Sequence, residues 1–360
     1  MNCNALRIAF AVLLLHPGCG TSQEVLEVRY EDGEQLRFVG QLISLQSGIE
    51  LASGEWEFWY ANGERQALGA FQAGAIPGPM DLDADATDIP RVGRVGRWTF
   101  WSPDGEKETE GEYLEGHKHG LWRSWWPEGE LRSEGQFEAG EATGPHRRWH
   151  RNGQLASETE FVAGLKHGLL REWNERGRLL RRGQYEGDQR VGKHNLWDES
   201  GVKREEAAFV DGYQHGLRTT WDEDGCLEWQ TLYQGGVQHG PFRLFHSSGA
   251  LRQQGEFRFG EQNGPLSAYS ETGHCEWEFD YVDGKQDGKR TFWYPNGHKR
   301  SQGSYRGGLP VGEHREWYPS GRLKSVGRFR MGRPVGNWHA WNEDGTVDAT
   351  LTGNYAGGAR

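Results

Sequence analysis

The chain has 360 residues, of which 54 are glycine and 17 are tryptophan, and only 35% of its residues are hydrophobic. This composition is typical of many tight turns joined by short aromatic strands, and it argues against a deep aliphatic core. The formal net charge of −11 argues against a nucleic-acid partner, because phosphate binding needs a basic face.

Residues 1–19 have the pattern of an export signal. Arg7 provides a positive start, and the apolar run from Ile8 to Leu15 is followed by Cys19. A run of eight residues is too short to span a bilayer, which needs about 20. The segment ending at Cys19 resembles a bacterial lipobox, although histidine and proline stand where a leucine and a small residue are usual. We therefore expect an exported, membrane-anchored lipoprotein, periplasmic or at the cell surface, with Cys19 as the lipidation candidate; plain secretion and a cytosolic chain are the alternatives.

Residues 20–53 form an N-terminal segment with one degenerate cap repeat, and about twelve tandem repeats fill residues 54–360. An insertion at residues 75–92 interrupts the repeats and contains four aspartates. Three of these aspartates have the spacing of early calcium-loop ligands, but the glycine and glutamate that an EF-hand needs later in its loop are missing. The sequence predicts an acidic loop here and leaves calcium binding open.

The repeats have a period of 24 residues. Two glycines keep this step, one from Gly96 to Gly336 and the other from Gly105 to Gly345. Such a period predicts an all-β fold, an elongated single-layer antiparallel sheet of tandem 24-residue β-hairpins. An aromatic residue lies four positions before the second glycine and is most often tryptophan. These tryptophans are the predicted structural core: Trp101, Trp125, Trp149, Trp173, Trp197, Trp221, Trp293, Trp317 and Trp341.

Each repeat contains a turn such as Ser102–Gly105, in which proline, a short polar residue and glycine predict a type I turn with a glycine bulge. A three-residue loop would place Thr99 opposite Thr109. Trp101 would then share one face with Gly111, and the indoles would lie over strand glycines. We expect this face to be packed and the opposite face to be charged and solvated.

A unit of the form Gly-x-Trp-x-x-Trp/Tyr-x-x-x-Gly, followed by a further aromatic residue and glycine, resembles the MORN repeat. It is most similar to the bacterial MORN variant, which is also found in YwqK-like antitoxins. The resemblance covers residues 54 to about 350. It implies an elongated antiparallel sheet used for protein contacts, self-association and, in some members, lipid binding. A YwqK-like antitoxin would act in the cytosol beside its toxin, so the export signal argues against that role.

The sequence contains no pattern that indicates catalysis, a metal or a cofactor. No nucleophile recurs beside a histidine and a carboxylate, and no glycine-rich phosphate loop precedes a helix. A histidine column precedes the first glycine of several repeats, but its members would lie about 10 Å apart, too far to share one zinc ion. Cys226 and Cys275 lie two repeats apart and should be free thiols. We therefore expect a protein that is not an enzyme.

An arginine column lies on the same strand face as the tryptophans: Arg123, Arg147, Arg171, Arg243 and Arg315. At intervals of about 10 Å, these guanidiniums could form a stripe that contacts anionic headgroups or an acidic partner. Alternatively, each arginine stacks on a neighbouring indole and covers the aromatic core.

These observations favour a non-catalytic repeat scaffold at the cell envelope, which binds an unknown protein partner through an extended β-sheet surface and has scope for self-association and membrane contact. A cell-wall polysaccharide or anionic-lipid binding module is one alternative, and it would need aromatic rings open to solvent. A YwqK-like antitoxin component is the other alternative, if the chain is cytosolic.

Overall fold

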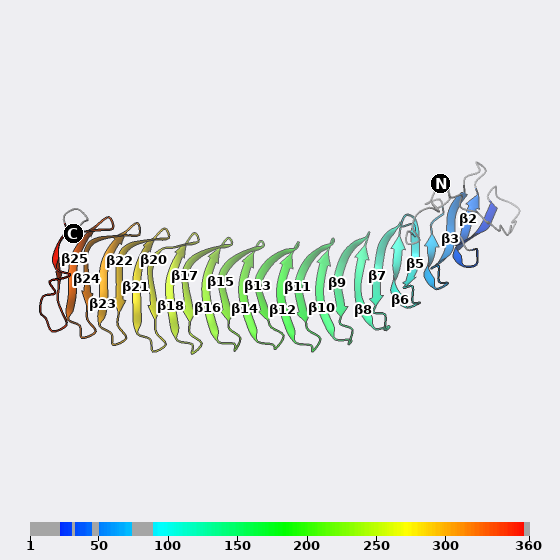
Figure 1. Ribbon diagram of the computed structural model, residues 1–360. Coiled ribbons are helices and arrows are strands. Elements are labelled where there is room, and N and C mark those ends of the chain that lie inside the picture. The colour runs from blue at the N-terminus through cyan, green and yellow to red at the C-terminus, as the bar shows by residue number, and fades with distance from the viewer. Residues whose placement is uncertain (1–21, 31–32, 45–49, 74–88, 356–360) are drawn as a thin grey trace. The chain divides into compact units, whose positions relative to one another are not determined.

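The computed structural model describes residues 22–30, 33–44, 50–73 and 89–355 (Figure 1). Cys19, the rest of the predicted signal and most of the acidic insertion lie outside these residues. The described residues form strands and turns and contain no helix. The strands are β1 (Ser22–Arg29), β2 (Leu36–Ser44), β3 (Glu50–Trp59), β4 (Arg65–Phe71), β5 (Arg94–Trp101), β6 (Lys107–Leu114), β7 (His117–Trp125), β8 (Leu131–Glu138), β9 (Glu141–Trp149), β10 (Leu155–Val162), β11 (Leu165–Trp173), β12 (Leu179–Glu186), β13 (Gln189–Trp197), β14 (Lys203–Val210), β15 (Tyr213–Trp221), β16 (Leu227–Gln234), β17 (Val237–Phe245), β18 (Leu251–Arg258), β19 (Glu261–Gln262), β20 (Gly264–Tyr269), β21 (Cys275–Val282), β22 (Lys285–Trp293), β23 (Lys299–Arg306), β24 (Leu309–Trp317), β25 (Leu323–Arg330), β26 (Arg333–Ala340) and β27 (Gly353–Tyr355).

The chain divides into two compact units. Unit 1 comprises residues 1–180 and 185–189, and unit 2 comprises residues 181–184 and 190–360. Within each unit, strands pair antiparallel with their neighbours in the chain and form an open sheet (Figure 1). The predicted all-β fold of tandem hairpins is confirmed. Cys226 and Cys275, both in unit 2, are free, as predicted.

Two kinds of turn alternate along the sheet. In the first, Gly105 N donates to Ser102 O at 3.0 Å and has a φ of 82°, which confirms the type I turn with a glycine bulge. In the second, Glu115 and Gly116 have φ values of 52° and 80°. Two consecutive positive φ values define a type I′ turn, whose twist matches that of the flanking strands. From β5 to β26, each repeat is therefore a hairpin joined to the next repeat by a two-residue turn.

The predicted register is wrong by one residue beyond the first turn. Trp101 pairs with Lys107, but Phe100 pairs with Thr109, so Glu108 is an extra residue in β6. The same β-bulge recurs in hairpins of both units. A shift of one residue moves all following side chains to the other face of the sheet.

The bulge separates side chains that the sequence placed together. Thr99 and Trp101 lie on one face, which we call the tryptophan face. Trp98, Gly111 and Tyr113 lie on the opposite face, which we call the core face. The most buried indoles are those of the core face, so the Trp101 column is not the main core of the repeats.

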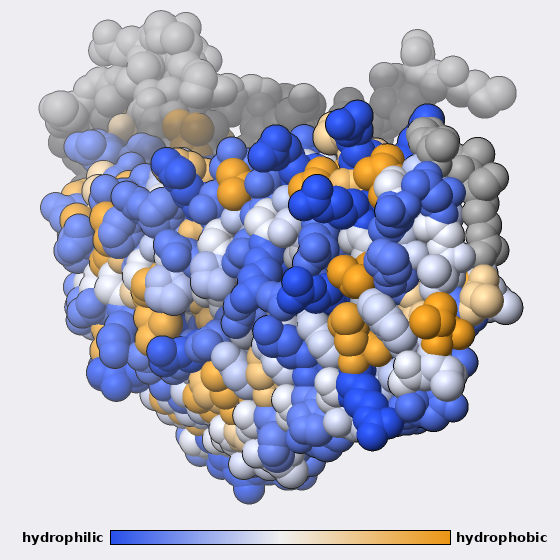
Figure 2. Space-filling model, turned by 90° about the vertical axis from the view of Figure 1, so that its left-hand side faces the viewer, coloured by the Kyte–Doolittle hydropathy of each residue, from blue (hydrophilic) through white to orange (hydrophobic). Residues whose placement is uncertain are grey.

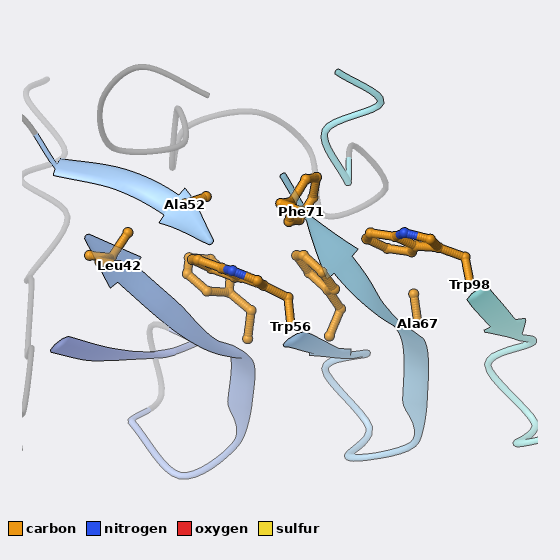
Figure 3. Close-up of a cluster of buried hydrophobic side chains, with 8 residues drawn as sticks. Leu42, Ala52, Trp56, Ala67, Phe71 and Trp98 are labelled. Atoms are coloured by element: carbon orange, nitrogen blue, oxygen red, sulfur yellow. The ribbon is translucent and has the colours of Figure 1, made fainter. Parts of the chain in front are cut away.

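The most completely buried cluster lies in the N-terminal part of unit 1 (Figure 3). The indoles of Trp56 and Trp98 are 1% and 0% exposed. Phe71 lies between them, with its ring edge-on to both at centroid distances of 6.0 and 5.1 Å. Edge-on contacts of this kind stabilise aromatic pairs beyond the area they bury. The cluster comprises Phe38, Leu42, Ala52, Trp56, Phe58, Ala67, Phe71 and Trp98.

Strand glycines make room for the rings of the core face. A Cβ at Gly69 would overlap the indole of Trp98, and one at Gly111 would overlap that of Trp122. The sequence therefore predicted correctly that strand glycines lie under aromatic rings, but the rings belong to the Trp98 column and not to the Trp101 column.

Candidate binding surfaces

The Trp101 column forms a half-buried stripe on the tryptophan face. All nine of its tryptophans are intermediate between buried and exposed. Lysines cover some of these indoles: Lys107 Nζ lies 4.3 Å from the ring centroid of Trp125, and Lys203 Nζ lies 4.9 Å from that of Trp221. In several other repeats the position of Lys107 is held by leucine, which is the cross-strand neighbour of the tryptophan, as Leu131 is of Trp125. The stripe is therefore only partly open to solvent.

The arginines of unit 1 form a ladder with glutamates on the same face. Arg123 Nε lies 3.5 Å from a Glu134 carboxylate oxygen, and Arg147 contacts both Glu134 and Glu158 at 3.4 and 3.0 Å. Arg171 continues the ladder to Glu158 at 3.1 Å. Three positive and two negative groups leave a net charge of +1 (3 − 2) on these five residues. In this structure the predicted stripe of guanidiniums alternates with glutamates and forms a charge ladder.

The ladder is confined to unit 1. The cross-strand partners of Arg243 and Arg315 are Gln254 and Val326, which carry no charge, and Arg315 pairs instead with Glu313 at 2.6 Å. The five predicted arginines thus share a register position but differ in their partners. Their stacking on indoles, the alternative interpretation, is replaced in unit 1 by carboxylate contacts for Arg123, Arg147 and Arg171.

Large apolar side chains are exposed along the hairpin edge of unit 2 that holds the two-residue turns. Phe259 and Met331 are 74% and 59% exposed, and they occupy turn positions with φ values of 51° and 47°. Bulky residues are strained in this region, at a cost of about 1 kcal/mol or more. Figure 2 shows hydrophobic residues in separate patches among hydrophilic ones on the surface that it presents. We call this edge the apolar rim: Val210, Tyr213, Val237, Phe259, Val282, Leu309 and Met331.

Other repeats place small or acidic residues at the strained position. Ala139 and Ala163 occupy it in unit 1, and Asp211 and Asp283 occupy it in unit 2, with φ values of 47° to 49°. Aspartate tolerates this conformation better than phenylalanine or methionine does. The stability of the turn therefore does not explain Phe259 and Met331. Sequence reasoning missed them, although the change from Asp or Ala to a bulky residue before the turn glycine is a readable signal.

Unit 1 contains a cleft of about 570 Å³ on the core face. Its wall includes the last residues of the insertion, and its aromatic and cationic lining was not predicted from the sequence. We call it the unit 1 cleft and define it by Tyr60, Arg91, Tyr113, His117, Lys118 and Trp122. Its volume lies within the range of about 300–1,000 Å³ that is typical of small-ligand sites.

Arg94 anchors one wall of this cleft. Its guanidinium is surrounded by acceptors: Nε and Nη2 donate to Pro90 O and Ile89 O at 2.8 Å each, and Nη1 donates to the Tyr113 hydroxyl at 3.0 Å. Burial lowers the pKa of Arg94. The guanidinium carbon of Arg94 lies 4.7 Å from the ring centroid of Trp98. Arg94 therefore fixes the end of the insertion against the sheet.

Lys118 also lines the cleft. Its Nζ is 4.3 Å from the ring centroid of Trp122 and 5.1 Å from that of Phe137. Burial lowers the pKa of this ammonium, and the nearby charge of Arg91 lowers it further. Among the described residues, no carboxylate lies within ion-pair distance of Lys118 or Arg91. The cleft thus combines aromatic surfaces with two cations that lack an acidic partner in the described structure.

The repeats of this architecture match a known family. The model of the MORN repeat variant matches residues 118–139, 142–163 and 286–306. The chain carries MORN-variant repeats. The three matches lie in both units, and the 24-residue step of the hairpins continues through the repeats between them. No curated protein sequence matches the chain.

Solved structures give a weaker comparison for the MORN-variant repeats. The crystal structure of TcdB2-TccC3-Cdc42 is 11% identical, with a TM-score of 0.18 and coverage of 92% of this chain and 17% of that one. The Photorhabdus luminescens Tc holotoxin pore with the mutation TccC3-D651A is also 11% identical, with a TM-score of 0.17 and coverage of 91% and 17%. The chain spans about one sixth of these proteins, and at such TM-scores the likeness supports no conclusion on function.

Two searches of the described residues bear on other classes of site. No helix among them has the length and apolar character of a membrane span. No group of three or more His, Cys, Asp or Glu side chains with metal-binding geometry occurs in the same residues.

Proposed function

We propose that the MORN-variant repeats form a non-catalytic scaffold at the cell envelope that binds a protein partner through the surface of its sheet, with the apolar rim as the main contact. The observation that carries this proposal is the exposure of Phe259 and Met331 at strained turn positions. Aromatic residues and methionine are enriched at protein interfaces, where a few of them dominate the binding energy. Several large apolar side chains exposed along one edge mark a candidate contact with another molecule, although the Phe259 ring also lies 5.2 Å from that of His239.

The charge distribution supports a protein rather than an anionic surface. The ladder neutralises most of the arginine charge in unit 1, so the attraction to anionic lipid headgroups is weak there. The rings of the core face pack against one another, as in the contact of Tyr113 with Trp122 at 4.9 Å. Packed rings are expected of a scaffold, whereas a polysaccharide-binding module needs rings that are open to solvent. Location at the envelope rests on the export signal of the sequence alone.

The test uses two substitutions that should not harm the fold. Phe259→Asp and Met331→Asp introduce the residue found at the equivalent positions 211 and 283, so turn stability should be kept or improved. The full chain and this double variant serve as baits in membrane extracts, and each retained protein is purified and its affinity measured. We expect the double variant to lose at least tenfold in affinity for the partner while its melting temperature does not fall.

Asp283→Ala is the matched control, because it changes the same turn position to the residue found at 139 and 163 without altering the apolar rim. It should bind as the wild type does. Equal binding of the double variant and the wild type would refute the rim as the contact surface. Binding of the wild type to anionic vesicles in place of any protein would favour the lipid alternative.

A further inference from the structure

We propose that two copies of the chain associate through the edge that holds the two-residue turns, with a basic row in unit 2 of one copy against an acidic row in unit 1 of the other. The basic row is Lys285, Arg306, Leu309, Arg330 and Arg333. The acidic row is Glu138, Glu141, Val162, Leu165 and Glu186. The inference deepens the proposed function and rests on it in part, because Leu309 belongs to the apolar rim and a second copy is then the partner of that part of the rim.

The ten side chains occupy equivalent places in their repeats. Each is the last residue of a strand before a two-residue turn or the first residue of the strand after it. The two residues that flank one turn are paired, as Glu138 is with Glu141 and Arg330 is with Arg333. Glu138 and Arg330 directly follow aromatic residues of the core face, so by alternation both rows lie on the tryptophan face. The rows therefore share one edge, one face and a step of about 4.8 Å from strand to strand.

Like charges oppose each other at two of these turns. Glu138 and Glu141 are a directly opposed pair in unit 1, and Arg330 and Arg333 are one in unit 2. Like charges in directly opposite positions destabilise a pair of strands. All four side chains are exposed, and within the described residues none of them makes an ion pair or a side-chain hydrogen bond. Each pair is therefore uncompensated in one copy, and a surface of opposite charge would compensate it.

The two rows also have opposite net charge. The basic row has four cations, and the carboxylates of Asp283 and Asp287 beside it leave a net charge of +2 (4 − 2). The acidic row has three carboxylates. Lys166 follows this row but lies on the core face, with its Nζ 5.5 Å from the ring centroid of Tyr185. Complementary charges of this kind steer association and fix the register of an interface.

The order of the side chains favours rows that run in opposite directions. β26 of one copy then faces β8 of the other, and β22 faces β12. The opposite charges that meet are Arg333 with Glu138, Arg330 with Glu141 and Lys285 with Glu186. Rows in the same direction also match three opposite charges, but only the antiparallel order brings the two like-charged turns together. A two-fold axis, the commonest symmetry of homodimers, produces this order.

Apolar contact accompanies the charges in the middle of the rows. In the antiparallel order Leu309 meets Val162, and these side chains are 44% and 56% exposed in the single copy. Arg306 meets Leu165, over which its aliphatic stem can lie while the guanidinium stays in water. The contact is thus a small apolar centre between pairs of opposite charge, and its affinity should depend strongly on salt.

Sedimentation equilibrium of the full chain tests the proposal in about 0.01 M and about 1 M salt, where the screening length is about 30 Å and about 3 Å. We expect dimers whose dissociation constant rises about tenfold or more at the higher salt. Glu138→Arg with Glu141→Arg, and Arg330→Glu with Arg333→Glu, should each weaken self-association about tenfold or more at low salt. Each double variant gives one turn the pair that the other turn has naturally, so its melting temperature should not fall.

An equimolar mixture of the two double variants is the decisive measurement, because their reversed charges are complementary to each other. The mixture should form heterodimers with nearly the affinity of the wild type. Glu130→Arg with Glu223→Arg is the matched control, since it makes the same change of charge as the first variant at exposed residues of the opposite edge. This control should associate as the wild type does.

Three results would refute the proposal: a wild type that stays monomeric at low salt, self-association that neither double variant weakens, and a mixture that does not restore it. The proposed function has a separate readout, because Phe259 lies outside both rows. Phe259→Asp should lose the partner retained from membrane extracts and keep self-association. Loss of self-association in the charge variants with that partner still bound would therefore leave the proposed function standing.

Discussion

At the scale of single residues, the core face repeats one motif of ring, glycine and carbonyl. Trp122 lies over Gly111, and its Nε1 donates to Glu112 O at 3.0 Å. His146 lies over Gly135 in the same way, with its Nε2 2.8 Å from Gln136 O. The histidine contact requires the tautomer with hydrogen on Nε2. Tryptophan and histidine thus both place a flat ring with an N–H at its edge over a strand glycine, whereas Leu170, Phe242 and Leu266 hold this position in other repeats.

The histidines of this column make stability depend on pH. Burial lowers the pKa of His146 and His194, so the folded state binds fewer protons than the unfolded state near pH 6. Their contribution is fully present above the unfolded value of about 6.5 and is lost as pH falls through the lower, folded value. His146→Trp with His194→Trp should therefore reduce the loss of melting temperature between pH 7.5 and pH 5.

The control for this experiment is His117→Gln, which removes an exposed histidine outside the column. Its pH profile should follow that of the wild type. Should the double tryptophan variant lose as much stability on acidification as the wild type, the column histidines do not govern the acid side of the profile.

At the scale of elements, the sequence correctly predicted features that depend on one strand, such as the turn type and the alternation of faces. It failed to predict the register, which depends on how two strands are aligned. The turn residues after Ser102 determine the turn type, and alternation along β7 placed Arg123 and Trp125 on one face, where the structure has them. The bulge residue after each turn is Glu108 in one repeat and Arg132 or Ala156 in others. No residue type is common to the bulge position, so the sequence could not predict that the bulge moves the following side chains to the other face of the sheet.

The candidate surfaces also differ in how far the sequence could predict them. The arginine column was predicted by residue and face, but the glutamates that neutralise it lie on paired strands whose register was misassigned. The unit 1 cleft depends on how Ile89 to Arg91 fold against the sheet, and this is a tertiary contact without a local pattern. Only the apolar rim left a signal within one repeat, at Phe259 and Met331.

One prediction at this scale concerns the turn glycines. Gly177 has a φ of 75°, and a Cβ there would lie about 3.1 Å from the side chain of Gln154. Gly177→Val should disrupt its own turn, because a β-branched residue is strained at positive φ. Hydrogen exchange should become faster around residues 168–192 and remain nearly unchanged in distant repeats. Uniform loss of protection over the whole chain would contradict the nearest-neighbour behaviour of a repeat array.

A second prediction concerns the charge ladder. Arg147 has its pKa raised by hydrogen bonds and charge from Glu158 first and Glu134 second. The pair is partly exposed, with side-chain exposures of 41% for Arg147 and 25% for Glu158, so a double-mutant cycle of Arg147→Gln and Glu158→Gln should give a coupling of at most about 1 kcal/mol. The coupling should shrink in 1 M NaCl, where the screening length falls to about 3 Å. A larger, salt-independent coupling would show that the ladder is not a surface network.

At the scale of the whole molecule, stability is distributed unevenly among repeats that contact mainly their neighbours. The fully buried rings of Trp56, Phe71 and Trp98 lie in the N-terminal part of unit 1. The Trp101 column in both units is only half-buried. Repeat arrays unfold in parts when neighbouring units differ in stability. The N-terminal cluster should therefore be the last part of unit 1 to lose protection on heating.

The location of the chain decides which partners the repeats can meet, and Cys19 gives the sharpest test. If Cys19 is lipidated, Cys19→Ala should release the protein from the membrane fraction, and mass spectrometry of the wild type should find an acylated N-terminus at Cys19. The fold should remain intact, because Cys19 precedes the first strand, β1 at Ser22–Arg29, and circular dichroism serves as the control. A full-length, unprocessed wild-type chain in the cytosol would contradict export. In that case the antitoxin alternative would regain its basis, because the repeats would then share a compartment with an intracellular toxin.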